Sequence, residues 1–242
     1  MIDITMTATL RADLVEQTLE SFTQNLFAGT RGQYRLIVNV DPTPLNASCS
    51  PMDVVCVVKS FSQTAHCRIS KRPSFLKAMM WCWGQTQSEL VLNLEDDWTL
   101  NRKVDIQAVL QHIRDHDEHY MVRFSKNTIP QTLETHAAKW RVVDGVLEND
   151  GEAYYSNNPA IIRRSFMESV LPLVNRKWAF ETQLRHDDVN PNQQLKELMK
   201  EKKYCLWAKP GDKSLVTDIG TAWRNARSIG KSKDKRMPLR WV

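Results

Sequence analysis

The sequence predicts an α/β fold in which a mostly parallel central sheet is flanked by helices and accompanied by a smaller mixed sheet. Short apolar runs rich in β-branched residues alternate with segments of helical periodicity over residues 2–100, the pattern of consecutive βα units. Polar or acidic residues follow several of these runs, at the edge where open parallel sheets bind ligands. The 242 residues, 42% hydrophobic and 25% charged, fit one ordinary folded domain.

The first part of the chain carries the clearest strand and helix signals. Two prolines after Asp41 end the second apolar run, since proline cannot continue a central strand. A later run of Leu, Val and Asn ends in Glu95-Asp96-Asp97-Trp98. The expected elements are a strand at 2–6, a helix at 12–22, strands at 34–40 and 54–58, a helix at 74–83 and a strand at 90–94.

The regular alternation fades beyond this point. Asp144-Gly145 favours the tight primed turn of a β-hairpin. The remaining expected elements are a helix at 104–116, a strand at 120–124, a hairpin at 139–147, an extended segment at 158–162, helices at 163–171 and 193–202, and a strand at 204–208. We expect a single domain over residues 1–242, with a nucleotide-binding half (1–100), an acceptor half (101–222) and a basic tail (223–242).

Neither a secretory signal nor a membrane span is visible in the sequence. No cationic stretch precedes an apolar run at the start of the chain, and no span of about 18 apolar residues occurs. A cytoplasmic protein is therefore expected. The five Cys residues are scattered, odd in number and without C-x-x-C pairs, which predicts reduced thiols and no structural zinc.

The three acids that close the strand at 90–94 carry the main functional signal. Carboxylates at the rim of an apolar sheet repel one another, and a divalent cation would relieve that repulsion. Mg²⁺ or Mn²⁺ prefers one or two carboxylates together with diphosphate oxygens and water. If strand geometry persists, Glu95 and Asp97 point to one side and Asp96 to the other. We assign Asp97 to the metal and Glu95 to a ribose hydroxyl or a water-mediated metal contact; the alternative is an acidic turn or a helix N-cap.

The order of these elements resembles the GT-A glycosyltransferases, particularly the broad family 2-like group. The resemblance rests on a strand, a Thr-rich loop, a long helix, a strand ending in Asp41, and a later strand ending in Leu-Glu-Asp-Asp-Trp. It covers residues 2–99 and implies a GT-A, Rossmann-like fold, a nucleotide sugar such as a UDP-sugar as donor, and Mn²⁺ or Mg²⁺ as cofactor. The nucleotide-sugar contacts that it implies are Thr7, Thr9, Arg11, Asp41 and Glu95, with Asp97 on the metal. Asp96, between the last two, is counted with the nucleotide-sugar contacts, and a structural role is its alternative. Glu95 stands where the family's D-x-D motif has its first Asp.

The same resemblance extends to the diphosphate. Lys77, in the helix before the acidic strand, falls where the family often places groups near the diphosphate, although a solvated surface lysine is equally consistent. Residues 216–220 resemble the late loop that closes over the diphosphate in the family. Asp218 stands where many members have a His, and is assigned to the metal; capping the next helix is the alternative. Arg224 would neutralise the leaving group.

The acceptor half is expected to supply the acceptor site and, if the reaction inverts the configuration of the sugar, a general base. Ala179-Phe180-Glu181 resembles the family's apolar pair followed by an acid at a helix start, so Glu181 is the first candidate and Asp188 a competitor. The alternative for Glu181 is an acid of the first helical turn, which the helix dipole favours.

The basic tail raises the question of the acceptor. From Trp223 to Val242 there are seven Lys or Arg and one Asp, interleaved with aromatic residues. This composition suits contact with a phosphate backbone, so hydroxymethylated pyrimidine in phage DNA is one acceptor class. With a merely solvated or membrane-surface tail, the acceptor would be a glycan, a lipid-linked glycan or a protein.

Two functions from other classes stay open. A nucleotidyltransferase would also use paired acids, but residues 7–11 lack the Gly-rich phosphate loop usual after the first strand. A non-catalytic nucleic-acid-binding protein would use the tail alone and would leave the acidic cluster unexplained.

Overall fold

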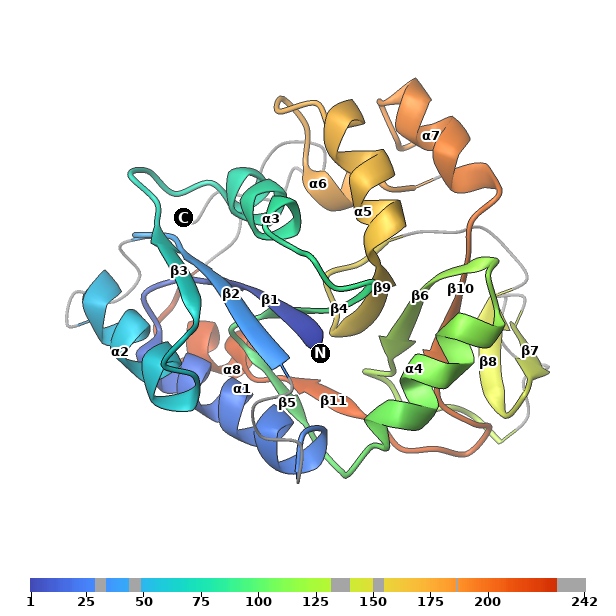
Figure 1. Cartoon of the computed structure of the whole chain (residues 1–242), viewed down its shortest axis with the longest axis horizontal. Helices are drawn as coiled ribbons and strands as arrows, with labels where there is room; N and C mark the ends of the chain where they lie inside the picture. The colour runs from blue at the N-terminus through green and yellow to red at the C-terminus, as the bar shows by residue number, and fades with distance from the viewer. Residues whose placement is uncertain (29–33, 44–48, 132–139, 150–154, 186, 230–242) are drawn as a thin grey trace.

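The computed structural model describes residues 1–28, 34–43, 49–131, 140–149, 155–185 and 187–229, and shows a mixed sheet covered by helices on both faces (Figure 1). The elements are β1 (Ile2–Ala8), α1 (Ala12–Asn25), β2 (Tyr34–Val40), α2 (Pro51–Phe61), β3 (His66–Ile69), α3 (Phe75–Gly84), β4 (Leu90–Glu95), β5 (Trp98–Leu100), α4 (Ile106–Asp115), β6 (His119–Phe124), β7 (Trp140–Val143), β8 (Val146–Asn149), β9 (Ala160–Arg163), α5 (Arg164–Val170), the 3-10 helix η2 (Leu171–Leu173), α6 (Phe180–Gln183), α7 (Gln193–Lys200), β10 (Lys203–Trp207), β11 (Val216–Asp218) and α8 (Gly220–Asn225).

The main sheet has the strand order β3-β2-β1-β4-β9-β6-β10-β8-β7 among the described residues. Strands β1 to β4 run parallel, and β9 lies antiparallel between β4 and β6. Residue Thr7 of β1 pairs with Glu95 of β4, and Ala8 pairs with Val40 of β2. The carboxyl ends of β1, β2 and β4 therefore meet at one edge of the sheet.

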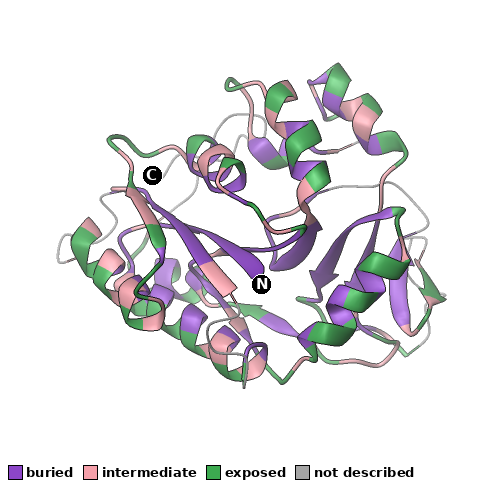
Figure 2. Cartoon of the chain, viewed as in Figure 1, coloured by how far each residue is buried: buried purple, intermediate pink, exposed green. Residues whose placement is uncertain are grey.

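Two apolar layers sandwich this sheet. Helices α1, α2 and α4 pack on one face, whereas α3, α5, α6 and α7 pack on the other. Alternate residues of a strand feed the two layers, as in β9, where Ile161 joins the first layer and Ile162 the second. The central strands are buried on both faces (Figure 2), which explains why they read as nearly continuous apolar runs.

The predicted fold class is confirmed, with one difference in how the second half is built. The mixed strands expected to form a separate sheet continue the large one through β9. The small second sheet is instead the antiparallel pair of β5 and β11, which brings residues 216–218 alongside 98–100. The expected hairpin at 139–147 is present as β7 and β8, with its turn residues Asp144 and Gly145 at φ of 47° and 80°.

The expected strand at residues 54–58 is wrong, because this segment lies within helix α2. Ser50 caps the helix by accepting from the amide of Asp53, whose carboxylate accepts from the amide of Ser50, and Pro51 occupies the first turn. Val54 and Val58 are one helical turn apart and are the buried residues of α2. The third strand of the sheet is β3, which lacks a strong apolar pattern because its residues are exposed or half-buried.

A buried polar network fastens α3 to the centre of the sheet. The amide oxygen of Asn93 accepts from Thr5 Oγ1 at 3.0 Å and from Trp83 Nε1 at 3.0 Å. Its amide nitrogen donates to the Tyr155 hydroxyl at 3.1 Å. One side chain of β4 thereby satisfies polar groups from β1, α3 and the segment that precedes β9.

No helix in the described ranges is long and apolar enough to span a bilayer.

Replacing Asn93 tests this network. We expect Asn93→Ala to lower the free energy of unfolding by about 3 kcal/mol, because three buried groups lose their partner. Urea denaturation followed by circular dichroism measures this change. Gln24→Ala, which removes an exposed hydrogen bond on α1, is the control and should change stability by less than about 0.5 kcal/mol. Equal stability of the two variants would contradict the role assigned to Asn93.

Candidate nucleotide-sugar site

A pocket opens at the sheet edge where β1, β2 and β4 end. Its walls come from the first loop, the residues after β2, the start of α3 and the turn after β4. The lining residues are Thr7, Ala8, Thr9, Arg11, Asp41, Thr43, Pro73, Ser74, Phe75, Glu95, Asp96 and Asp97. The structure thus brings together seven residues that the sequence assigned to nucleotide or metal, although they lie up to 90 positions apart.

Asp41 is held rigidly in this wall. One of its oxygens accepts from Asn39 Nδ2 at 2.9 Å, and the other accepts from the backbone amide of Ser74 at 2.9 Å. Ser74 also caps α3. The carboxylate therefore fixes the end of β2 to the start of α3 and is presented to the pocket in one orientation.

Asp96 is the structural member of the acidic run. It is 2% exposed and pairs with the guanidinium group of Arg11 through both oxygens. It also accepts from the amide of Thr9 at 2.8 Å and from the Thr9 hydroxyl at 3.2 Å. Through these bonds, Asp96 holds the loop after β1 against the turn between β4 and β5.

Asp97 lies between two guanidinium groups. Its Oδ2 is 3.1 Å from Arg11 Nη1 and 3.4 Å from Arg224 Nη1. Gly220, at the start of α8, comes so close that a Cβ there would lie 2.0 Å from the same oxygen. Glycine is therefore required at this position for α8 to bring Arg224 onto the carboxylate.

The four charged groups balance one another. Burial alone would lower the pKa of Arg11, but the nearby carboxylates of Asp96 and Asp97 outweigh it and raise that pKa above its ordinary value. Both arginines stay cationic, so the cluster of two carboxylates and two guanidinium groups is neutral. Removing any one member would leave an uncompensated buried charge.

The donor set fits a divalent cation that is shared with a ligand. Glu95 and Asp97 line the same pocket, and Mg²⁺ or Mn²⁺ needs only one or two carboxylates when diphosphate oxygens complete its shell. Arg11 and Arg224 already offset much of the negative charge of Asp97. A cation beside Asp97 would therefore depend on the charge of a diphosphate for its binding.

Glu181 approaches the same edge from the other half of the chain. It begins α6 and accepts from the backbone amide of Asn157 at 2.7 Å, just before β9. The pKa of the buried Tyr155 hydroxyl lies well above its ordinary value. Burial raises this pKa most, and the negative charges of Glu181 and Glu95 raise it further. The charges of Glu181 and Glu95, which come from different halves of the chain, therefore act on the same phenol.

Three other assigned residues lie away from the pocket wall. Asp188 is exposed and pairs with Lys196 at 2.6 Å. The Lys77 side chain is exposed on α3. Asp218 caps α8, accepting from the Thr221 amide at 2.9 Å and from its hydroxyl at 2.8 Å. For Asp218, the geometry agrees with the capping alternative.

The first residues of the basic tail, from Trp223 on, pack against the rest of the protein. Trp223 is 6% exposed, and its indole nitrogen donates to Asp13 at 3.1 Å. The guanidinium of Arg227 lies 4.0 Å from the centre of its ring. Residues 230–242, which contain most of the basic charge, lie outside the described residues.

Sequence reasoning missed several residues around the pocket. Ser74 and Phe75 carried a readable signal, a serine at the N-cap position of a helix. Thr43, between two prolines, and Tyr155, in a short polar segment, carried none. Tyr155 becomes visible only when β9 is placed beside β4, because it then reaches Asn93.

No family model matches the sequence, and no curated protein matches it significantly. Solved structures do match. S. aureus TarS aligns with a TM-score of 0.53 and 12% identity, over 90% of this chain and 37% of that chain. TarS 1–349 in complex with UDP gives a TM-score of 0.53 and 13% identity, over 90% and 60% of the two chains. A CMP:2-keto-3-deoxy-manno-octonic acid synthetase complexed with CTP gives 0.51 and 13%, over 94% and 98%.

The chain spans little more than a third of TarS and nearly all of the synthetase. At 12% to 13% identity, these likenesses concern the fold. They agree with the sheet and helix layers described above, and the chain has the GT-A type of α/β fold.

Proposed function

We propose that this chain transfers a sugar from a nucleotide sugar to a hydroxyl group. The observation that carries the proposal is the convergence of Asp41, Glu95 and Asp97 in one pocket at the carboxyl ends of three parallel strands. This is where open α/β sheets bind nucleotides. TarS 1–349, whose fold is similar, forms a complex with UDP, which supports a UDP-sugar as the donor.

The charges around Asp97 suit the departure of a nucleoside diphosphate. Breaking the sugar–phosphate bond leaves extra negative charge on the diphosphate, and preorganised cations there lower the barrier. Asp97 would hold Mn²⁺ or Mg²⁺, which supplies Lewis-acid stabilisation of that charge. Arg224 adds a cation fixed by its contact with Asp97 and by its bond to Thr221 Oγ1 at 2.7 Å.

Glu181 is the proposed general base. It lies in the first turn of α6 and accepts from the backbone amide of Asn157, which precedes β9, the antiparallel neighbour of the strand that ends in Glu95. A carboxylate there can accept the proton of an acceptor hydroxyl as the oxygen attacks the sugar. Asp188 is the weaker candidate, because its carboxylate is paired with Lys196.

The acceptor half contains a second hollow. It lies between β6, β8 and β10 and contains both ring and cationic side chains, among them Arg123, Lys126, Trp140 and Tyr204. The Arg123 guanidinium sits 4.9 Å from the centre of the Tyr204 ring. Aromatic and cationic walls suit a sugar ring or a phosphate-bearing acceptor.

We propose two alternative classes of acceptor. Hydroxymethylated pyrimidine in phage DNA is supported by the basic composition of residues 223–242. A glycan, lipid-linked glycan or protein acceptor requires nothing of the tail. Mass spectrometry of hydroxymethylated DNA and of glycan acceptors, each incubated with the enzyme and its donor, separates the two classes.

Nucleotidyl transfer is the second candidate, favoured by the near-complete alignment with a CTP-bound synthetase. Arg11 counts against it. A nucleoside triphosphate needs cations in the loop after the first strand, whereas Arg11 is buried against Asp96 and Asp97. The products distinguish the reactions, since sugar transfer releases a nucleoside diphosphate and nucleotidyl transfer releases pyrophosphate.

Asp97→Asn tests the donor site. A panel of nucleotide sugars with Mn²⁺ is first screened for thermal stabilisation of the wild-type chain. With the donor so found, we expect the substitution to reduce release of nucleoside diphosphate by about 100-fold or more, because an amide would hold far less well the Mn²⁺ or Mg²⁺ that offsets the charge of the leaving group. The substitution also leaves a guanidinium charge without its partner, so the melting temperature should fall, and a thermal melt checks that the variant is folded at the assay temperature.

The control is Asp115→Asn, which changes an exposed acid on α4 that bonds to Gln111. It should leave release of nucleoside diphosphate unchanged. Gly220→Ala is a second probe of the same place, since its Cβ would displace the Asp97 carboxylate. Full activity of a folded Asp97→Asn variant would rule out the assignment of Asp97.

Glu181→Gln tests the base. Transfer to the acceptor should fall by about 100-fold or more, because the amide cannot accept the proton, while thermal stabilisation by UDP should stay as in the wild type. Glu197→Gln, an exposed acid of α7, serves as the matched control. If transfer persists in Glu181→Gln and disappears in Asp188→Asn, the base is Asp188.

A further inference from the structure

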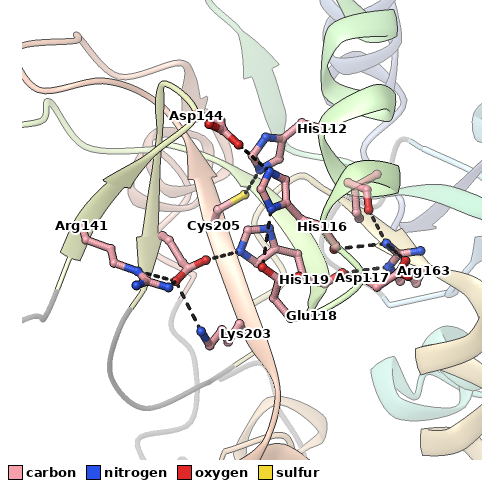
Figure 3. A network of polar contacts seen from close by, with 12 residues as sticks. His112, His116, Asp117, Glu118, His119, Arg141, Asp144, Arg163, Lys203 and Cys205 are labelled. Carbon is pink, nitrogen blue, oxygen red and sulfur yellow. Dashed lines mark hydrogen bonds and ion pairs between the residues drawn. The ribbon is translucent and has the colours of Figure 1, made fainter.

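A compact group of nitrogen and sulfur donors lies away from the nucleotide pocket. His112 near the end of α4, His116 just after it and His119 at the start of β6 face Cys205 of β10 (Figure 3). None of these residues lines the pocket. Because β6 runs parallel to β4, His119 lies at the edge of the sheet opposite the carboxyl ends that form the pocket.

Three of these residues have the spacing of a metal site. His112, His119 and Cys205 are buried, and each offers a ligand atom within 4.8 Å of the other two. Zinc bonds to His nitrogen at about 2.0 Å and to Cys sulfur at about 2.3 Å, so tetrahedral ligands lie about 3.3 to 3.7 Å apart. The distance of 3.5 Å between His112 Nε2 and Cys205 Sγ already matches that edge of a tetrahedron.

His119 supplies an independent sign of a missing partner. Its ring is completely buried, and its Nδ1 has no hydrogen-bond partner among the residues that the structure describes. A buried nitrogen left without a partner is unfavourable, and such groups are rare in folded proteins. A metal ion would use the lone pair of that nitrogen.

The other ring nitrogen of His119 is arranged as metal-binding histidines require. His119 Nε2 is 2.8 Å from Glu148 Oε2, which gives it a carboxylate acceptor for its proton. Arg141 and Lys203 hold that carboxylate from outside the cluster. Histidine ligands of metals commonly donate their second N–H to a carboxylate, which fixes the ring and the tautomer.

The charge state of the cluster is compatible with metal binding. Burial, with the neighbouring imidazoles of His116 and His119, lowers the pKa of His112 to about 4, so its ring is neutral near pH 7. Burial raises the pKa of the Cys205 thiol above its usual range. Metal binding would therefore release the thiol proton to solvent as the sulfur–metal bond forms.

We propose that His112, His119 and Cys205 bind a zinc ion that ties α4 to β6 and β10. Two imidazoles and a thiolate suit a borderline-soft ion in tetrahedral geometry. His116 lies beside these ligands, with its ring centre 4.4 Å from that of His112, and its own ring nitrogens face Glu118 and Asp144. The sequence carried half of this signal, the spacing H-x3-H-x2-H, but the absence of C-x-x-C pairs led to the expectation of no structural zinc.

Cobalt provides the direct test on the full-length chain. The protein is stripped with a chelator and titrated with Co²⁺, and the absorption spectrum is recorded. We expect a sulfur-to-cobalt charge-transfer band and the strong d–d bands of tetrahedral cobalt, saturating at one ion per chain and displaced by Zn²⁺. An oxygen-lined site at Glu95 and Asp97 would give neither a thiolate band nor tetrahedral bands.

Two cysteine variants locate the site. Cys205→Ser should remove the charge-transfer band and weaken Zn²⁺ binding by about 100-fold or more, whereas Cys82→Ser, at another buried cysteine, should leave both unchanged. Glu148→Gln should weaken binding by about 10-fold while keeping the band. Chelation of the wild type should also lower its melting temperature, and Zn²⁺ should restore it.

The proposal is overturned if the wild-type chain shows no charge-transfer band, or if the band survives in Cys205→Ser. Should Cys205→Ser fail to fold, the wild-type titration and melting curves still decide. Thermal stabilisation by UDP in the zinc-free protein is a separate measurement, so failure of the zinc site and failure of the nucleotide site can be told apart.

Discussion

The buried cluster of Arg11, Asp96, Asp97 and Arg224 is the constraint on which the pocket at the carboxyl ends of β1, β2 and β4 depends. Its members come from three separate segments: the loop after β1, the turn after β4, and α8 near the described end of the chain. A buried charge without its partner costs several kcal/mol, so each segment can pack only where the other two supply the opposite charge. The small β5–β11 sheet delivers α8 to this position, and Gly220 allows the final close approach.

Because of this cluster, the three adjacent acids Glu95, Asp96 and Asp97 have different surroundings. Asp96 is fully occupied by Arg11 and Thr9, which makes it a brace between two loops. Asp97 faces the pocket with a guanidinium group on either side, and Glu95, the last residue of β4, remains on the lining. Because Asp96 is fixed in this way, it also sets the direction of the neighbouring side chains of Glu95 and Asp97. Consecutive carboxylates can thus be tolerated at a sheet rim because Arg11 and Arg224 balance the charges of Asp96 and Asp97.

The sequence was informative wherever local periodicity and tertiary burial agree. β1, β2 and β4 were predictable from their apolar runs, and the hairpin from Asp144-Gly145. The run at Val54 to Val58 was ambiguous, because valines one helical turn apart also fit a buried strand; the Ser50 and Asp53 capping box was the deciding signal. No local signal could show that Arg11 forms an ion pair with Asp96, 85 residues away, or that Cys205 contacts His112, 93 residues away. Those contacts follow from strand order.

Strand order also explains why a metal clamp would matter where we place it. The nucleotide half and the acceptor half share one sheet, but the single four-residue strand β9 joins them, antiparallel to both neighbours. Beyond β9, a polar His119–Glu148 pair is buried among strands β6, β8 and β10. Burying such polar groups costs free energy, which their mutual pairing must offset. An ion shared by α4, β6 and β10 would add fixed bonds there without touching the pocket proposed for the donor.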